Sequence, residues 1–92
     1  MPDLLGDDEI ASRLEDSAWQ REGDEIVREL KFADFAAAMA FVNRVAQEAE
    51  EANHHPDILV HGWNNVRLTL STHTKGGVTD ADRALAEQID AL

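Results

Sequence analysis

The sequence contains no cysteine and little positive charge. Without cysteine, the chain can form neither a disulfide framework nor a thiolate metal site. Its 8 lysines and arginines stand against 19 aspartates and glutamates, which gives a formal net charge of −11. Because nucleic acids and anionic membranes are bound through cations that neutralise phosphate, we expect neither class of partner.

Long apolar segments are also missing. No apolar run approaches the roughly 20 residues that a transmembrane helix needs. The acidic stretch MPDLLGDDEI lacks the basic and then apolar layout of a signal peptide. The length of 92 residues predicts a single domain, residues 1–92, with a thin core that an oligomeric interface would support. We therefore expect a cytoplasmic domain.

Apolar residues recur at three- and four-residue steps in three segments, which predicts three helices. The first covers residues 7–16. The longest begins after Asp34 as its N-cap and runs to about Ala52, before a proline that the helix cannot pass. The last begins after Thr79 as its N-cap, with Asp82 at the third helical position as in a capping box. Its predicted apolar stripe is Leu85, Ile89 and Leu92.

Alternating apolar and polar residues predict strands in the segments between the helices. They are EIVRELKF (25–32), where Arg28 breaks the alternation, DILVHGW (57–63) and NNVRLTLSTH (64–73), with a short strand near Trp19. Strands joined by short turns pair antiparallel, so we predict an α+β fold. It consists of a four-stranded antiparallel sheet with about three helices packed on one face.

Parity along the last strand predicts which side chains face the core. Val66, Leu68 and Leu70 alternate with polar residues and should point towards the helices. His73 has the opposite parity and should share the polar face of the sheet.

All four histidines of the chain lie in the segment NHHPDILVHGWNNVRLTLSTH, residues 53–73. Histidine, with an unperturbed pKa of about 6.5, can give and take protons near neutrality. His54 and His55 occupy a loop between a helix end and a strand, where functional groups are over-represented. If the two following strands pair as a hairpin, His73 lies close to both. The pattern therefore predicts three histidines at one end of the sheet.

Three imidazoles could hold a metal, act as acid and base, or be structural. A zinc site is disfavoured because the adjacent His54 and His55 tend to point apart and no ordered second shell is evident. No serine or cysteine stands out as a nucleophile, and KGGVT lacks the pattern of a phosphate-binding loop. General acid–base catalysis is favoured over metal binding, and structural histidines are the remaining alternative.

Three segments resemble the signature of the pterin-4a-carbinolamine dehydratases, also called 4a-hydroxytetrahydrobiopterin dehydratases. These segments are HHP, N-x-V-x-L-x-L-S-T-H and G-V-T-x-x-D, and the upstream Trp19 and L-K-F-A-D-F agree. The resemblance covers the chain from Ile10 to Ile89. It implies a hydro-lyase that removes water from 4a-hydroxytetrahydropterin to give quinonoid dihydropterin, without a metal or an organic cofactor. It also implies a homodimer or homotetramer and a functional link to an aromatic amino acid hydroxylase through tetrahydropterin recycling.

The resemblance assigns the catalytic histidines to His54, His55 and His73. We expect His55 and His73 to contribute most, and His54 to bind and orient the substrate. His61 lies outside this set and is interpreted as a strand residue without a catalytic role.

Other positions are assigned supporting roles by the resemblance, each with a structural alternative. Asp82 is a supporting carboxylate or only a helix cap. Glu50 is a helix-end acid of the site or only a solvated acid at the end of a helix, and Trp19 is a tryptophan near the site or a core residue. Ser71 and Thr72 hydrogen-bond the pterin or only decorate the strand.

The chain departs from the family pattern at three places. Ile58 stands where an aromatic residue is common, and Asn53 stands where an acid is common. The segment DILVHGW is one residue longer than the short family form, and Gly62 could absorb the extra residue as a bulge. The alternative function is a non-catalytic binding or assembly module of the coactivator or assembly-factor type. Retention of all three histidines favours the enzyme.

Overall fold

The computed structural model describes residues 4–14 and 17–92, without the side chains of Asp7, Arg13 and His73. Residues 15 and 16, at the end of the first predicted helix, lie outside this part. In chain order the elements are α1 (Asp7–Leu14), β1 (Gln20–Glu22), β2 (Glu25–Lys31), α2 (Phe35–Ala52), β3 (Asp57–His61), β4 (Asn65–Leu70), the 3₁₀ helix η1 (His73–Lys75) and α3 (Asp80–Asp90).

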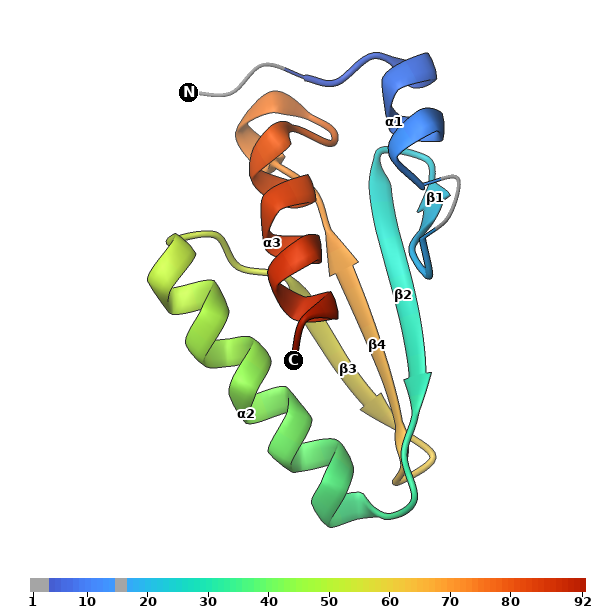
Figure 1. The fold of residues 1–92 in the computed structure, drawn as a ribbon, viewed down its shortest axis with the longest axis vertical. Coiled ribbons are helices and arrows are strands. Elements are labelled where there is room, and N and C mark those ends of the chain that lie inside the picture. The colour runs from blue at the N-terminus through green and yellow to red at the C-terminus, as the bar shows by residue number, and fades with distance from the viewer. Residues whose placement is uncertain (1–3, 15–16) are drawn as a thin grey trace.

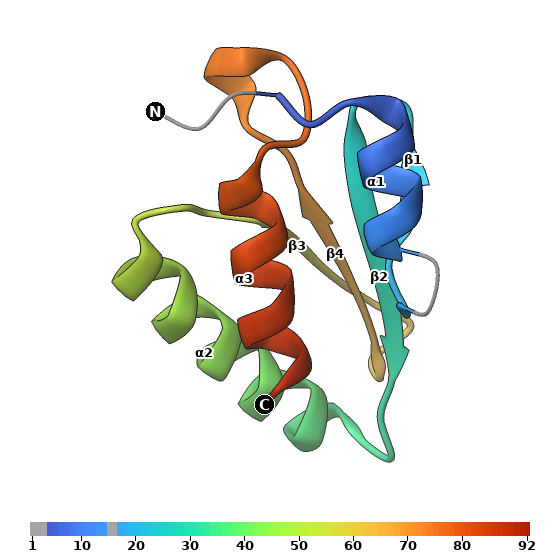
Figure 2. The same ribbon diagram turned by 45° about the horizontal axis from the view of Figure 1, so that its top comes forward.

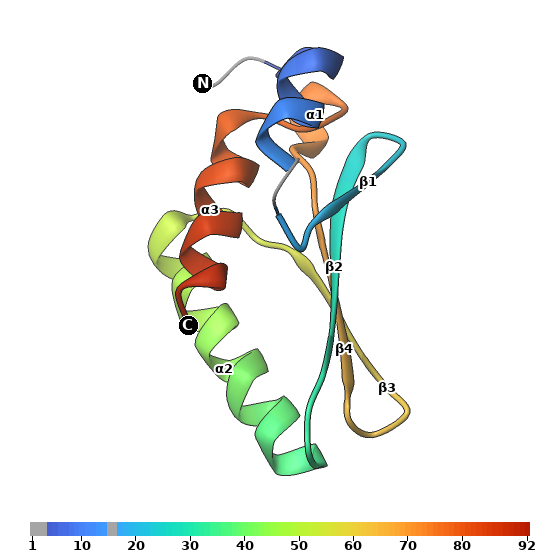
Figure 3. The same ribbon diagram turned by 45° about the vertical axis from the view of Figure 1, so that its right-hand side comes forward.

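The four strands form one antiparallel sheet in the order β1-β2-β4-β3. Figures 1 and 2 show α3 lying between α1 and α2. Figure 3 shows all three helices on the same face of the sheet. The predicted α+β fold is confirmed. Among the described residues, no helix combines the length and apolar character that crossing a membrane requires.

The core lies between the sheet and the helices, and the central strand β4 supplies its floor. Val66, Leu68 and Leu70 are completely buried, as their parity predicted. Small and branched side chains of α2, among them Ala38 and Val45, close the core from the helix side. Burial of such side chains is the main favourable term in the folding of a domain this small.

The start and end of α2 and the start of α3 are where the sequence placed them, and the predicted end of the first helix lies outside the described residues. Asp34 caps α2 by accepting a hydrogen bond from the Ala37 amide at 2.7 Å. The predicted apolar stripe of α3 is confirmed for Leu85 and Ile89, which are buried. It is wrong for Leu92, which lies beyond the end of α3 with 40% of its surface exposed.

Arg28 breaks the alternation of β2 because its side chain has a partner on the helix side of the sheet. Its guanidinium donates to Asp90 Oδ1 at the end of α3. The same oxygen accepts the indole N–H of Trp19 at 2.9 Å. One carboxylate thus ties β2 and the residue before β1 to the last helix.

The strand predicted to reach His73 ends earlier, at Leu70. The carbonyl oxygen of Thr72 accepts the amides of Lys75 and Gly76, both at 2.9 Å, and this turns the chain. Gly76 permits the turn through its left-handed backbone, with φ of 71°. His73 therefore begins η1, so strand parity does not determine where its side chain points.

The bulge predicted at Gly62 is wrong. The pairing of β3 with β4 is uninterrupted from Asp57 opposite Thr69 to His61 opposite Asn65. Gly62 instead lies in the hairpin loop between the two strands, where it and the next residue have positive φ angles of 55° and 59°.

Candidate active site

The end of α2 places His54 and His55 beside the start of α3. Asn53 adopts the left-handed conformation with φ of 51°, and its amide donates to carbonyl oxygens of the last turn of α2. The His54 amide then donates to the carbonyl oxygen of Ala49 at 3.1 Å. This Schellman-like ending turns the chain sharply, so the two histidines leave the helix at a fixed position.

Asp82 caps α3 from inside the protein, as the capping box predicted. The Thr79 side chain accepts the Ala81 amide at 3.2 Å, and Asp82 Oδ2 accepts the Thr79 amide at 2.8 Å. Thr79 and Asp82 are both completely buried. A buried carboxylate needs such donors, because an unpaired charge in this position would be strongly destabilising.

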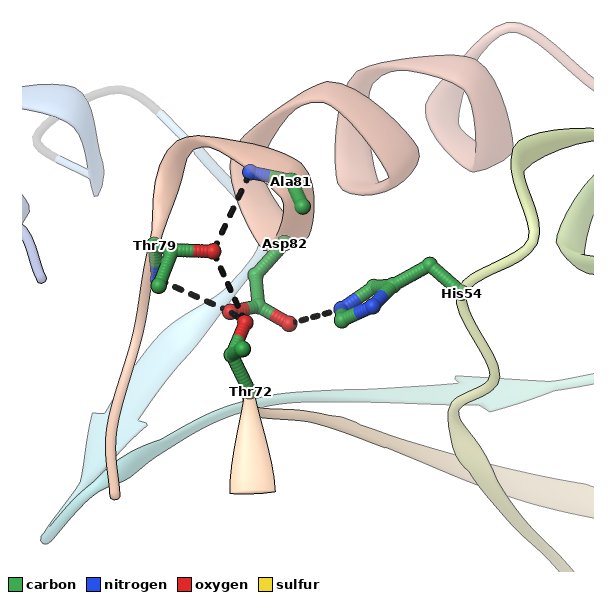
Figure 4. Close-up of polar contacts among 5 residues, drawn as sticks. All are labelled: His54, Thr72, Thr79, Ala81 and Asp82. Atoms are coloured by element: carbon green, nitrogen blue, oxygen red, sulfur yellow. Dashed lines mark hydrogen bonds and ion pairs between the residues drawn. The ribbon is translucent and has the colours of Figure 1, made fainter. Parts of the chain in front are cut away.

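The second oxygen of Asp82 contacts His54. Asp82 Oδ1 lies 2.5 Å from His54 Nε2, and Figure 4 shows the ring reaching the carboxylate from the loop after α2. The His54 side chain is 18% exposed, whereas that of Asp82 is fully buried. Asp82 therefore both caps α3 and contacts His54, and a supporting role in catalysis stays a prediction.

Thr72 completes this buried network and uses its hydroxyl within the protein. Its Oγ1 lies 2.8 Å from Asp82 Oδ2 and 2.7 Å from Thr79 Oγ1. Only 8% of Thr72 is exposed. The sequence predicted Thr79 as a helix cap, but the spacing of Thr72 and Thr79 along the chain did not indicate that their hydroxyl groups would be hydrogen-bonded.

An open cavity of about 250 Å³ lies next to the network. Its lining residues come from the loop after α2 and from the segment after β4; they are Asn53, His54, His55, Ser71 and Thr74. Of these, Thr74 was not among the residues expected from the sequence. The cavity thus brings two of the three candidate histidines together with hydroxyl groups.

His55 and Glu50 form a loose, exposed pair at the margin of the site. His55 Nε2 lies 3.6 Å from Glu50 Oε1, and the two side chains are 57% and 78% exposed. Exposed pairs of this kind contribute about 0–1 kcal/mol. Glu50 therefore has little influence on how His55 is held.

The His73 side chain lies outside the described residues, so its convergence with the other histidines stays a prediction. Its backbone starts η1 between Ser71 and Thr74, which both line the cavity. Among the described residues, no group of three histidine, aspartate or glutamate side chains is placed to hold a metal ion.

Two other residues, of which only the first was a site candidate, lie elsewhere. Trp19 is 2% exposed and belongs to the core, where it lines a separate cavity under α1 and α3 instead of the one beside His54. His61 ends β3 at the hairpin, far along the strand from the loop that carries His54, and lies 3.8 Å from Glu29.

Known proteins are similar to this chain in sequence. The family model described as Pterin 4 alpha carbinolamine dehydratase matches residues 3–92. A Nocardia farcinica protein, provisionally named pterin-4-alpha-carbinolamine dehydratase, is 52% identical over 91 residues, which cover 98% of this chain and 95% of the relative. A Thermomicrobium roseum protein with the same provisional name is 52% identical over 89 residues, covering 96% and 95%.

Two solved structures are similar to the fold. One is a transcriptional coactivator/pterin dehydratase from Brucella melitensis, with a TM-score of 0.90, 34% identity and 97% coverage of both chains. The other is a pterin dehydratase-like protein identified as a RuBisCO assembly factor in the alpha-carboxysome. Its TM-score is 0.64 at 30% identity, covering 79% of this chain and 83% of that chain. With a family model spanning nearly its whole length, the chain belongs to the pterin 4 alpha carbinolamine dehydratase family.

Proposed function

We propose that the protein is a dehydratase that removes water from 4a-hydroxytetrahydropterin to give quinonoid dihydropterin, with His54, His55 and His73 as its acid–base groups. The observation that carries this proposal is the contact of 2.5 Å between His54 and the buried Asp82 at the wall of a cavity that His55 also lines. A buried carboxylate that orients an imidazole is a recurrent arrangement for proton transfer.

The reaction requires two proton movements and no change in oxidation state. One group protonates the C4a hydroxyl, and the C4a–O bond breaks as water leaves. Another group removes the proton from N5 as the bond between N5 and C4a becomes double. One proton is given and one is taken, which suits a pair of imidazoles.

The test is the decay of freshly generated 4a-hydroxytetrahydropterin, followed by absorbance with and without the protein. Replacing His54, His55 or His73 by alanine should slow the catalysed reaction by about 10²–10⁴-fold, the usual contribution of general acid–base catalysis. His61→Ala is the matched control and should keep full activity. Chelator should have no effect. The proposal would be refuted if 4a-hydroxytetrahydropterin decayed no faster with the wild-type protein than in buffer alone.

The alternative is a non-catalytic binding or assembly module. It has support in the two similar structures, since one protein is described as a transcriptional coactivator/pterin dehydratase and the other as a RuBisCO assembly factor. Retention of His54, His55 and His73 in this chain favours catalysis. A partner protein that binds the triple histidine variant as tightly as the wild type, together with an inactive wild type, would favour the module. Cytoplasmic location and the link to an aromatic amino acid hydroxylase stay predictions.

We also propose that two copies of the chain pair through β3, which lies at one edge of the sheet. Leu59, at the centre of β3, is 53% exposed on the face away from the helices. Two-fold antiparallel pairing about Leu59 would place each Asp57 opposite the partner's His61, so the acidic and basic ends would match.

The molar mass of the protein, measured by light scattering as it elutes from a size-exclusion column, tests this interface. Leu59→Lys places two cations opposite each other at the two-fold axis, and we expect a change from dimer to monomer. Leu92→Lys, which alters an exposed leucine away from the sheet edge, is the control and should leave the dimer intact. A wild-type monomer, or a dimer that survives Leu59→Lys, would contradict pairing through β3.

A further inference from the structure

The network behind Asp82 admits one arrangement of its hydrogens. The Thr72 hydroxyl donates to Asp82 Oδ2 at 2.8 Å. Because a hydroxyl has a single hydrogen, the contact of 2.7 Å between Thr72 and Thr79 must use the hydrogen of Thr79. Thr79 in turn accepts the Ala81 amide at 3.2 Å. Each group in this chain therefore donates to the next, from the backbone of α3 through the two hydroxyl groups to the carboxylate (Figure 4).

This direction determines which atom of His54 carries a hydrogen. Asp82 Oδ2 is occupied by two donors, the Thr72 hydroxyl and the Thr79 amide. An ionised carboxylate only accepts hydrogen bonds, so Oδ1 accepts as well and His54 Nε2 is the donor. A neutral His54 then carries its hydrogen on Nε2 and a lone pair on Nδ1. Within the described residues, the contact of the His54 ring with the carboxylate is made through Nε2, and His54 lines the cavity.

We propose that Thr72 and Thr79 are positioning residues, which orient Asp82 so that its Oδ1 accepts the hydrogen of His54 Nε2, and that His54 Nδ1 is the atom that exchanges a proton with the substrate. This inference rests on the proposed function and specifies how its site works. The Nδ1 lone pair takes the proton from N5, and Asp82 stabilises the imidazolium that forms. A second histidine of the site supplies the proton to the leaving hydroxyl. Solvent then returns both rings to their starting states, so protons balance over one turnover.

The first test needs no variant and no substrate. Side-chain ¹⁵N NMR of the full chain, at a pH where the His54 ring is neutral, distinguishes a protonated nitrogen from one with a lone pair. We expect the hydrogen on Nε2 and the lone pair on Nδ1. A neutral His54 with its hydrogen on Nδ1 would overturn the inference. Because this readout is independent of turnover, it separates a failure of the inference from a failure of the proposed dehydratase activity.

The second test removes the Thr72 hydroxyl with little change of shape. In Thr72→Val we expect the same His54 tautomer, because Asp82 Oδ1 still accepts from Nε2. We expect a kcat about 10-fold lower at nearly unchanged KM, because orientation of the base is lost rather than substrate binding. Thr72→Ser should restore kcat. Thr69→Val is the control, since Thr69 lies within β4 and is not one of the residues bonded to Asp82. If Thr72→Val keeps the wild-type kcat, Thr72 has no positioning role.

Should Thr72→Val fail to fold, Thr79→Ser provides the complementary measurement. This variant keeps the donating hydroxyl, so it should retain both the His54 tautomer and kcat. Loss of either would contradict the directional network.

Discussion

Asp82 Oδ1 lies 2.5 Å from His54 Nε2 although 28 positions separate the two residues in the chain. They come from the first turn of α3 and from the loop after α2, two segments that meet at one end of the sheet. The other oxygen of Asp82 holds the start of α3. A change at Asp82 should therefore affect both the site and the fold.

Asp82→Asn should lower both activity and stability. The amide keeps the size of the carboxylate but replaces one acceptor oxygen by a donor, so either His54 or the Thr72–Thr79 side of the network loses its partner. We expect kcat to fall by about 100-fold or more and the free energy of unfolding to fall by about 1–3 kcal/mol. Steady-state kinetics and urea unfolding measure the two effects. Asp80→Asn, an exposed acid in the same helical turn, should change both values far less.

Trp19→Phe should affect stability without affecting catalysis. The indole N–H that donates to Asp90 at 2.9 Å is lost, while most of the buried ring surface is kept. We expect unfolding to become easier by about 1 kcal/mol, with kcat/KM within about two-fold of the wild type, since Trp19 does not line the cavity beside His54. A large loss of kcat/KM in a stable Trp19→Phe protein would instead place this residue near the substrate, as the family resemblance implies.

Two substitutions of Asn53, the left-handed residue that ends α2, should differ in their effect on stability. Asn53→Ala should destabilise the protein by about 1 kcal/mol, because a Cβ without a compensating polar group disfavours φ of 51°. Asn53→Gly should be neutral or slightly stabilising, because glycine adopts this conformation freely. Thermal unfolding checks whether stability decreases in the order glycine, asparagine, alanine at position 53. Equal stabilities for the alanine and glycine variants would show that the turn does not depend on this backbone angle.

Leu68→Ala tests whether β4 is the floor of the core. Leu68 is completely buried, so we expect a loss of about 2–5 kcal/mol in the free energy of unfolding. Leu92→Ala makes the same chemical change at a side chain that is 40% exposed, and should cost much less. Comparable losses in the two variants would contradict the described core.

The sequence predicts the fold well where the hydrophobic period is long and the ends are marked. The helix α2 has both a repeating apolar pattern and a capping aspartate, and Leu68 and its neighbours on β4 alternate without exception. Prediction failed at His73 and Gly62, where turns decide the path. At His73 the turn depends on hydrogen bonds to the Thr72 carbonyl, and at Gly62 it depends on a loop length that parity does not encode.

The candidate site was only partly accessible from the sequence. The family resemblance pointed to His54 and Asp82, but no spacing rule indicated that they would touch, since their distance is set by how α3 packs beside the loop after α2. The link from Thr79 through Thr72 to Asp82 also depends on the tertiary structure. The acid–base chemistry of the site could be predicted from its residue types, whereas the direction of the hydrogen bonds between Thr79, Thr72 and Asp82 could not.

The double use of Asp82 has an evolutionary consequence. A descendant of this protein that abandoned catalysis would still need the carboxylate to begin α3, so selection for folding alone would preserve Asp82. His54 has no comparable duty in the helix and would be free to drift once turnover ceased to matter. When relatives are sorted into enzymes and binding proteins, the aspartate is therefore a poor marker, and the histidine opposite it is the informative one.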